Sequence, residues 1–285
     1  MYHIGMTQWI VGDEPLEVSC SRLAKYGYDG IEFAAEPYDL NALECVVLME
    51  RYGLNCHSLC GIFNENRDLT ANGKEGEKAV KYLIDSIDFA TVVGAKIIIA
   101  VPSPVGRTTK PEGKSIEELT ENAVANLRQA ADYAQKKGVK IAIEAINRYE
   151  TYFINTLSKA LDLVKKVDHP AVGVMADLFH MNIEEGSLTD SLYMIRDYLL
   201  HVHIADNTRE AAGMGHTDFK EVIRVLKNIG YEGSLTMEFM YRLADPYSAT
   251  DLSTQTQLMD RYAKQAIDYI RVVEESIRNV ESEEV

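Results

Sequence analysis

Four side chains that could hold a metal ion stand at the ends of four successive apolar runs of the chain. They are Glu144, Asp177, His203 and Glu238. If the runs are parallel strands of a closed barrel, their carboxyl ends meet at one face, where such barrels build their active sites. Three carboxylates brought together there would repel one another unless a divalent cation joined them. The sequence therefore predicts a metal centre, and its mostly oxygen ligands with one imidazole favour Mn²⁺ or Mg²⁺.

If the substrate carries a ketone, Glu144 and Glu238 suit proton transfer at a carbon atom beside it. Such a proton is not acidic enough to leave unaided at neutral pH, but a cation on the carbonyl and the neighbouring hydroxyl oxygen would stabilise the enediolate. A positioned carboxylate then removes the proton, which typically contributes roughly 10²–10⁴-fold to the rate. Because the two glutamates end the fifth and eighth runs of a predicted ring, they can flank a substrate and invert one carbon atom.

Single residues of this set also have ordinary structural interpretations. One Glu or Asp just past a strand is more often a helix N-cap or an ion-pair partner, but four at consecutive strand ends favour a metal. His201 is expected to face away from His203 and to pack as a core histidine. Glu32 ends the second strand, and we predict a substrate contact or a structural ion pair there with equal weight. Arg148 is expected to pair with a neighbouring carboxylate, and His3 to line the pocket floor or the core.

The elements that must position these residues alternate along the chain. Apolar β-rich runs separated by helical patterns are typical of repeated βαβ units. We predict strands near 2–6, 30–33, 54–60, 95–101, 139–144, 172–176, 199–205 and 234–238. Helices fill the intervals, and the ranges with clear signals are 14–26, 76–93, 115–137, 155–167, 219–229 and about 252–275. The predicted fold class is α/β, a (β/α)8 TIM barrel that forms one domain over residues 1–285, with an acidic C-terminal end that frays after about 275.

Two loops beyond strand ends carry further expectations. The segment 102–114 is the longest irregular stretch and follows the fourth strand, so we place it on the active face as a candidate lid. The segment 213–218 is predicted to be a tight turn into a helix at Phe219, with Asp218 as N-cap. A phosphorylated sugar stays open at that turn, although no lysine cluster supports it. Trp9 and Phe63 follow the first and third strands and are expected to form an apolar wall or ordinary packing.

Whole-chain properties narrow the class of protein. The 285 residues are 46% hydrophobic and 26% charged, with a formal net charge of −15. So negative a surface repels nucleic acid phosphates and anionic membranes, and we expect neither as a partner. No run reaches the length of a membrane span, and the first residues show no signal-peptide pattern. The four cysteines form no Cys-x-x-Cys pair, so we expect a reducing cytoplasm.

The strand-end segments together resemble a known family. The matching motifs are Glu144-x-x-Asn147-Arg148-x-Glu150, Asp177-x-x-His180-Met181, His203-x-x-Asp206-Asn207-x-Arg209 and Glu238. In order and spacing they resemble the xylose-isomerase-like sugar isomerase/epimerase superfamily, and within it the ketose 3-epimerases of the D-tagatose and D-psicose 3-epimerase group. Any one motif alone would be weak, whereas the four together are specific.

The resemblance implies roles for these residues. The four strand-end residues would hold one divalent cation per chain, with Mn²⁺ as the first choice and Co²⁺ or Mg²⁺ as alternatives. Glu144 and Glu238 would also be the acid/base pair, and Glu150, His180 and Arg209 would bind the sugar's oxygens. The implied reaction inverts C3 of a free ketose through a cis-enediolate. A homodimer or homotetramer is the implied assembly.

Three alternatives remain at this stage. The first keeps the metal site but moves hydrogen between C1 and C2, as in aldose–ketose, inosose or hydroxypyruvate isomerases. The second is a DNA-repair nuclease like endonuclease IV, which uses this barrel with three zinc ions. Against it, strand four ends in Val101-Pro102-Ser103 without a histidine, and His216-x-Asp218 reverses that family's order. The third is a sugar-binding barrel without catalysis.

Overall fold

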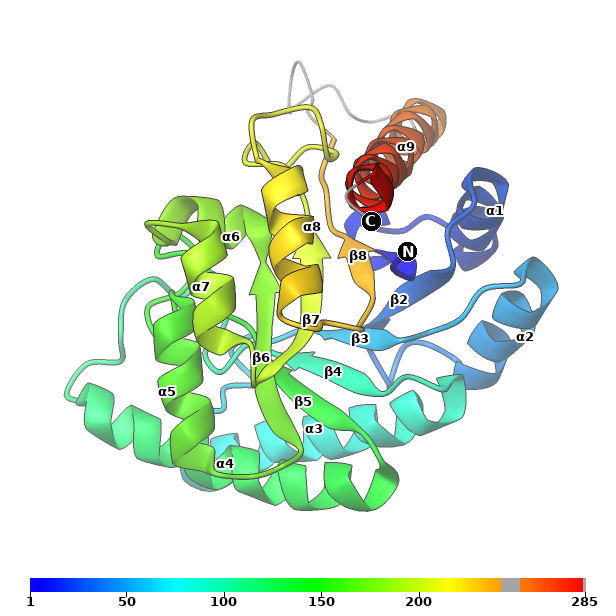
Figure 1. The fold of residues 1–285 in the computed structure, drawn as a ribbon. Coiled ribbons are helices and arrows are strands. Elements are labelled where there is room, and N and C mark those ends of the chain that lie inside the picture. Colours follow the sequence, from blue (N-terminus) through cyan, green and yellow to red (C-terminus); the bar gives the residue numbers. More distant parts are fainter. Residues whose placement is uncertain (242–251, 284–285) are drawn as a thin grey trace.

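The chain folds around a closed barrel of parallel strands. The structure is a computed structural model, and it describes residues 1–241 and 252–283. Within them, eight strands pair in chain order and β1 pairs with β8, which closes the ring (Figure 1). They are β1 (Ile4–Thr7), β2 (Gly30–Ala35), β3 (Ser58–Gly61), β4 (Ile97–Ala100), β5 (Lys140–Ile143), β6 (Val172–Asp177), β7 (Leu199–Ile204) and β8 (Leu235–Met237). Each overlaps a predicted strand, so the predicted barrel is confirmed.

Helices surround the barrel and connect its strands. They are η1 (Trp9–Val11), α1 (Leu16–Tyr26), α2 (Ala42–Tyr52), α3 (Gly73–Val93), α4 (Ile116–Lys137), α5 (Leu157–Val167), α6 (Leu178–Glu184), α7 (Leu188–Ile195), α8 (Phe219–Asn228) and α9 (Leu252–Glu283). The six predicted ranges are confirmed, whereas η1, α2, α6 and α7 had no predicted range. The helix α9 continues to Glu283, past its predicted end near 275.

Local sequence signals explain where the long helix α4 begins and ends. The hydroxyl of Ser115 accepts a hydrogen bond from the amide of Glu118 at 3.1 Å and caps α4, as the sequence predicted. At the other end of α4, Gly138 adopts φ 70°, a left-handed conformation that glycine takes without steric cost. Lys136 and Lys137 lie in the last turn, where cations are favourable.

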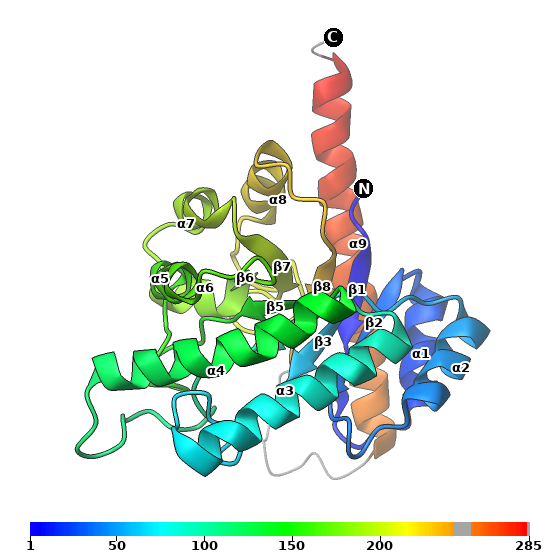
Figure 2. The ribbon, with the colours of Figure 1, turned by 90° about the horizontal axis from the view of Figure 1, so that it is seen from below.

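One pair and one group of three helices pack together in the outer layer. The helices α3 and α4 lie side by side across one flank of the barrel (Figure 2). The helix α9 packs against α1 and α8 and runs beside the N-terminal segment (Figure 2). Its Arg271 donates to the carbonyl of Tyr2 at 2.8 Å and to Asp29 at 2.6 Å, so the two ends of the chain are tied together. Among the described helices, none combines the length and apolarity that a membrane crossing needs.

The barrel interior changes from apolar to polar along the strands. Ile99, Ala142 and Met175 form a small buried cluster inside the ring. Ala142 and Met175 lie two residues before Glu144 and Asp177 in their strands, so all four side chains point inward. The acidic residues therefore sit one layer above the apolar cluster, at the C-terminal mouth of the barrel.

Candidate active site

The four strand-end residues converge at the C-terminal mouth. Glu144, Asp177, His203 and Glu238 each offer one potential ligand atom, and these atoms lie within 4.8 Å of one another. All four side chains are buried. They come from the ends of β5, β6, β7 and β8, so neighbouring strands bring them together as the sequence predicted. The structure thus provides the geometry for a metal centre, whereas the ligand roles themselves stay predictions.

Asp177 combines a structural role with an unused ligand atom. Its Oδ1 accepts hydrogen bonds from the amides of Phe179 at 2.7 Å and His180 at 3.1 Å, which caps α6. Its Oδ2 is buried and has no hydrogen-bond partner in the described ranges. The N-cap interpretation and the metal interpretation therefore apply to different oxygens of one carboxylate.

Glu32 determines how the His203 ring is turned. The Nε2 of His203 lies 3.0 Å from Oε1 of Glu32, which is almost completely buried. The other ring nitrogen, Nδ1, lies 3.3 Å from Oε2 of Glu238 and 3.8 Å from Oδ2 of Asp177. Of the two predictions for Glu32, the structural pairing is correct. The contact also directs a second nitrogen of His203 into the acidic cluster, where a metal ligand is needed.

The predicted orientation of His201 is wrong. Its Nε2 lies 3.0 Å from Oε2 of Glu32, so His201 and His203 each contact one oxygen of the same carboxylate. Side chains two residues apart in a strand point to the same face, not to opposite faces. His201 is fully buried in the barrel interior, which agrees with its prediction as a packed histidine. The hydroxyl of Ser58 also donates to Glu32, at 2.5 Å.

The electrostatics of the cluster fit a cation. Burial, with repulsion from Glu238, raises the pKa of Asp177 to about 8 and that of Glu144 well above its ordinary value. Burial would also raise the pKa of Glu238, but the neighbouring His203 and Arg209 outweigh it and lower that pKa. In the part of the chain described, Oδ2 of Asp177 and Nδ1 of His203 are both buried and have no hydrogen-bond partner. A divalent cation would relieve the repulsion and satisfy both atoms.

A pocket of about 210 Å³ opens beside the cluster. Its polar lining residues are Glu144, Glu150, His180, Arg209 and Glu238. Its apolar lining residues include Trp9, Cys60, Phe63, Val101 and Val105. Every residue that is predicted to bind the sugar lines this pocket, as do Trp9 and Phe63, whose function as an apolar wall against the sugar stays a prediction. The indole of Trp9 also donates to Oε1 of Glu238 at 2.8 Å, a contact that the sequence did not reveal.

Arg209 reaches into the pocket from an uncommon backbone conformation. It adopts φ 62°, which non-glycine residues rarely take. Its guanidinium carbon lies 4.6 Å from the centre of the Phe179 ring, and its two terminal nitrogens lie 3.5 Å from Glu150 and 3.4 Å from Glu238. Burial and the charge of Arg209 lower the pKa of His180 to about 3, so this imidazole is neutral. The pocket thus contains the fixed positive charge of Arg209 near the neutral ring of His180.

The loop 102–114 is attached to the active face. The amide of Val105 donates to the carbonyl of Phe63 at 3.2 Å, and that of Gly106 to the carbonyl of Glu150 at 2.8 Å. Arg107 pairs with Asp68 at 2.7 Å. The predicted position of the loop is confirmed, and its function as a lid stays a prediction.

The turn after β7 encloses a carboxylate of the chain itself. The amides of Gly213, Gly215 and Thr217 donate to Asp206 at 3.0, 2.7 and 3.0 Å. Hydrogen bonds from the amides of Thr217, Gly215 and Asn207 lower the pKa of Asp206 despite its burial. A β-carbon at Gly215 would collide with that carboxylate, which explains the glycine. As predicted, the turn leads into α8 with Asp218 as its N-cap.

Two other predicted residues lie outside the pocket. Arg148 pairs with Glu184 at 2.7 Å, which confirms its assignment to an ion pair. His3 is exposed, with its Nδ1 3.1 Å from Nε2 of His57. It immediately precedes β1, so it stands at the N-terminal end of the barrel and does not line the pocket floor.

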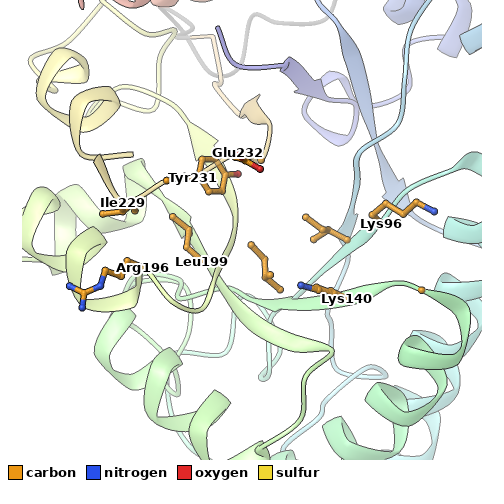
Figure 3. A pocket seen from close by; sticks show the side chains of 12 residues that line it. Lys96, Lys140, Arg196, Leu199, Ile229, Tyr231 and Glu232 are labelled. Carbon is orange, nitrogen blue, oxygen red and sulfur yellow. The ribbon is translucent and has the colours of Figure 1, made fainter. Parts of the chain in front are cut away.

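A second hollow, of about 380 Å³, lies at the N-terminal end of the barrel (Figure 3). Its wall includes Lys96, Lys140, Arg196 and Glu232, at the starts of strands or in the turns before them. Lys96 and Arg196 lie on opposite sides of this hollow (Figure 3). All four charged side chains are exposed, so solvent satisfies them.

Known proteins resemble the chain over most of its length. The model of the xylose isomerase-like TIM barrel family matches residues 20–271, which include all four cluster residues. An L-ribulose 3-epimerase from Methylomonas sp. (strain DH-1) is 30% identical over 257 residues, 87% of this chain and 88% of the relative. A 3-dehydro-D-guloside 4-epimerase from Escherichia coli (strain K12) is 30% identical over 239 residues, 80% of this chain and 88% of the relative. The crystal structure of D-psicose 3-epimerase with D-tagatose from Clostridium cellulolyticum H10 has a TM-score of 0.82 and 26% identity, over 96% of this chain and 99% of that chain.

Proposed function

Since the chain belongs to the xylose isomerase-like TIM barrel family and is an isomerase or epimerase acting on carbohydrates, we propose that it inverts C3 of a free ketose. The observation that carries this proposal is the buried cluster of three carboxylates and one imidazole beside a pocket of about 210 Å³. The relative named L-ribulose 3-epimerase supports the choice of C3.

The cluster is suited to one divalent cation, for which Mn²⁺ is the first choice and Co²⁺ or Mg²⁺ are alternatives. Glu144, Asp177, His203 and Glu238 would hold it. Two of their atoms, Oδ2 of Asp177 and Nδ1 of His203, are buried and have no hydrogen-bond partner within residues 1–241 and 252–283. A cation bound there would supply positive charge that makes a proton beside the ketone easier to remove.

Glu144 and Glu238 are the proposed proton carriers. Both line the pocket, and β6 and β7 separate the strands that carry them. One carboxylate accepts the proton from C3, and the other donates a proton to the opposite face of the same carbon. The hydrogen bond from Trp9 and the contact with Arg209 restrain both oxygens of Glu238. This restraint holds the carboxylate at the edge of the pocket.

Glu150, His180 and Arg209 are proposed to bind the sugar. All three line the pocket, and together they supply a carboxylate acceptor, a neutral ring and a cation, which are groups that can hydrogen-bond hydroxyl and carbonyl oxygens. The amides after β7, where barrels commonly bind phosphate, are already occupied by Asp206. We therefore propose an unphosphorylated ketose as the substrate.

Deuterium labelling tests the position of the reaction. A proton becomes acidic only beside a carbonyl, so a 2-ketose directs this site to C3, whereas a 3-keto sugar directs it to C4. The relative that is a 3-dehydro-D-guloside 4-epimerase makes the second reaction the main competitor. Incubation with D-fructose, D-tagatose and D-psicose in D₂O should place deuterium at C3 of the epimerised product. Label at C1 or C2 alone would indicate an aldose–ketose isomerase, and turnover only of a 3-keto sugar would indicate a 4-epimerase.

A metal count separates the epimerase from the nuclease. The epimerase predicts one bound divalent ion per chain after dialysis against Mn²⁺, whereas three zinc ions would support an endonuclease IV-like enzyme. The net charge of −15 already disfavours a surface that binds DNA.

A further inference from the structure

The amide of Asn147 has only one orientation that satisfies its neighbours. Its Oδ1 accepts a hydrogen bond from the amide of Tyr149 at 3.0 Å, and its Nδ2 lies 2.8 Å from Oε1 of Glu150. A flipped amide would turn its NH₂ group toward the Tyr149 N–H and its oxygen toward the Glu150 carboxylate. Asn147 is 1% exposed, so water does not replace either contact. The NH₂ group therefore faces the pocket side.

The same NH₂ group reaches one nitrogen of His180. Nδ2 of Asn147 lies 2.8 Å from Nδ1 of His180, and the backbone amide of Asn147 lies 3.4 Å from the same atom. Both groups can only donate, so Nδ1 of His180 must accept. The ring proton then belongs on Nε2. That nitrogen lies 3.9 Å from Glu144, beyond hydrogen-bond distance, in the wall of the pocket.

We infer that Asn147 is a positioning residue that fixes the tautomer of His180, so that Nε2–H is presented to an oxygen of the substrate. The inference rests on the proposed function, in which His180 contacts the sugar. Asn147 uses its second N–H on Glu150, so one amide orients two of the three proposed sugar ligands. A donor held toward an oxygen that gains negative charge in the reaction is worth about 10²–10³-fold in rate.

Asn147→Asp is the substitution that tests this inference. The shape is kept, but an acceptor replaces the donor that faces Nδ1 of His180. We expect the ring proton to move to Nδ1, or the ring to hold both protons, and kcat/KM for a ketose to fall about 10²–10³-fold. The tautomer is read from ¹⁵N–¹H correlation spectra of the full chain labelled at its 7 histidines and loaded with diamagnetic Mg²⁺. His180→Gln identifies the signal.

Asn155→Asp is the matched control. Asn155 is another buried asparagine of the same loop, and its Nδ2 donates to the carbonyls of Ile146 and Thr151, both at 2.9 Å. This variant should keep the tautomer of His180 and a kcat/KM within about threefold of the wild type.

The wild-type spectrum alone can overturn the inference, even if Asn147→Asp fails to fold. An Nδ1–H tautomer in the wild type, or an unchanged Nε2–H tautomer in Asn147→Asp, contradicts it. If the tautomer changes as expected but no ketose is epimerised by the wild type, the assignment of Asn147 stands and the proposed reaction fails.

Discussion

The hollow at the N-terminal end of the barrel is larger than the pocket at the C-terminal end, but only the pocket lies beside a cluster of buried acidic side chains. The N-terminal hollow has about 380 Å³ and the C-terminal pocket about 210 Å³. The four charged side chains of the N-terminal hollow are exposed, whereas the four side chains of the acidic cluster at the C-terminal mouth are buried and converge on one point. Burial makes polar groups costly unless they find partners, so convergent buried groups indicate a function better than volume does.

Matched glutamate substitutions at the two ends should give the largest difference. Glu238→Gln removes a proposed proton carrier and a proposed metal ligand, and we expect kcat/KM for D-psicose to fall about 10⁴-fold. Glu232→Gln makes the same chemical change in the N-terminal hollow and should stay within about twofold of the wild type. Equal losses in the two variants would remove the distinction between the ends.

The support of His203 by Glu32 should appear in metal affinity. Glu32→Gln leaves the four proposed ligands intact but weakens the contact that turns the His203 ring. Partners of this kind contribute about 10–100-fold to metal affinity, so the Kd for Mn²⁺ should rise by that factor. Titration of Mn²⁺ followed by electron paramagnetic resonance measures this constant. An unchanged Kd would mean that Glu32 only satisfies the two histidines.

The repulsion among the carboxylates predicts a pH-dependent stability. The pKa of Asp177 in the folded protein is about 8, above that of an unfolded carboxylate. At Asp177 and Glu144 the folded, metal-free protein therefore holds protons that the unfolded chain has lost, and the contribution of these two carboxyls to the free energy of unfolding falls as the pH rises from about 4 to about 8. Because a cation replaces these protons, we expect Mn²⁺ to stabilise the protein by about 2 kcal/mol more at pH 8 than at pH 6. Thermal unfolding with EDTA or excess Mn²⁺ measures this, and the same gain at both pH values would argue against a metal in the cluster.

The smallest expected effect concerns the indole of Trp9. Trp9→Phe keeps an aromatic wall but removes the hydrogen bond to Glu238. A hydrogen bond to a charged group contributes about 1.5 kcal/mol or more, so kcat should fall about tenfold with little change in KM. A higher KM with the same kcat would assign Trp9 to the apolar wall alone.

The sequence predicted best the features that lie within one strand, namely its position and the residue at its end. Each proposed metal ligand ends one apolar run, and the regular alternation of runs and helices indicates that neighbouring strands share an edge. The barrel and the convergence of Glu144 and Asp177 follow from these local patterns. The eight strands could be predicted without any knowledge of contacts across the ring.

Contacts across the ring were not predictable in the same way. Glu32 lies in β2, far along the chain from His201 and His203, and its burial between them depends on the closure of the barrel. The orientation of His201 was predictable from strand geometry, and the prediction misapplied that geometry. The hydrogen bond from Trp9 to Glu238 depends on the short helix η1, which gave no periodic signal.

The carboxylate of Asp206 bears on which anions the loop after β7 could bind. The backbone amides of this loop converge as they do in an anion-binding site, and the side chain of Asp206 occupies that site. Four backbone amides, those of Asn207, Gly213, Gly215 and Thr217, donate to this carboxylate. A shorter side chain at position 206 would leave these four donors without their acceptor, so a single substitution would turn a filled anion site of the chain into a vacant one.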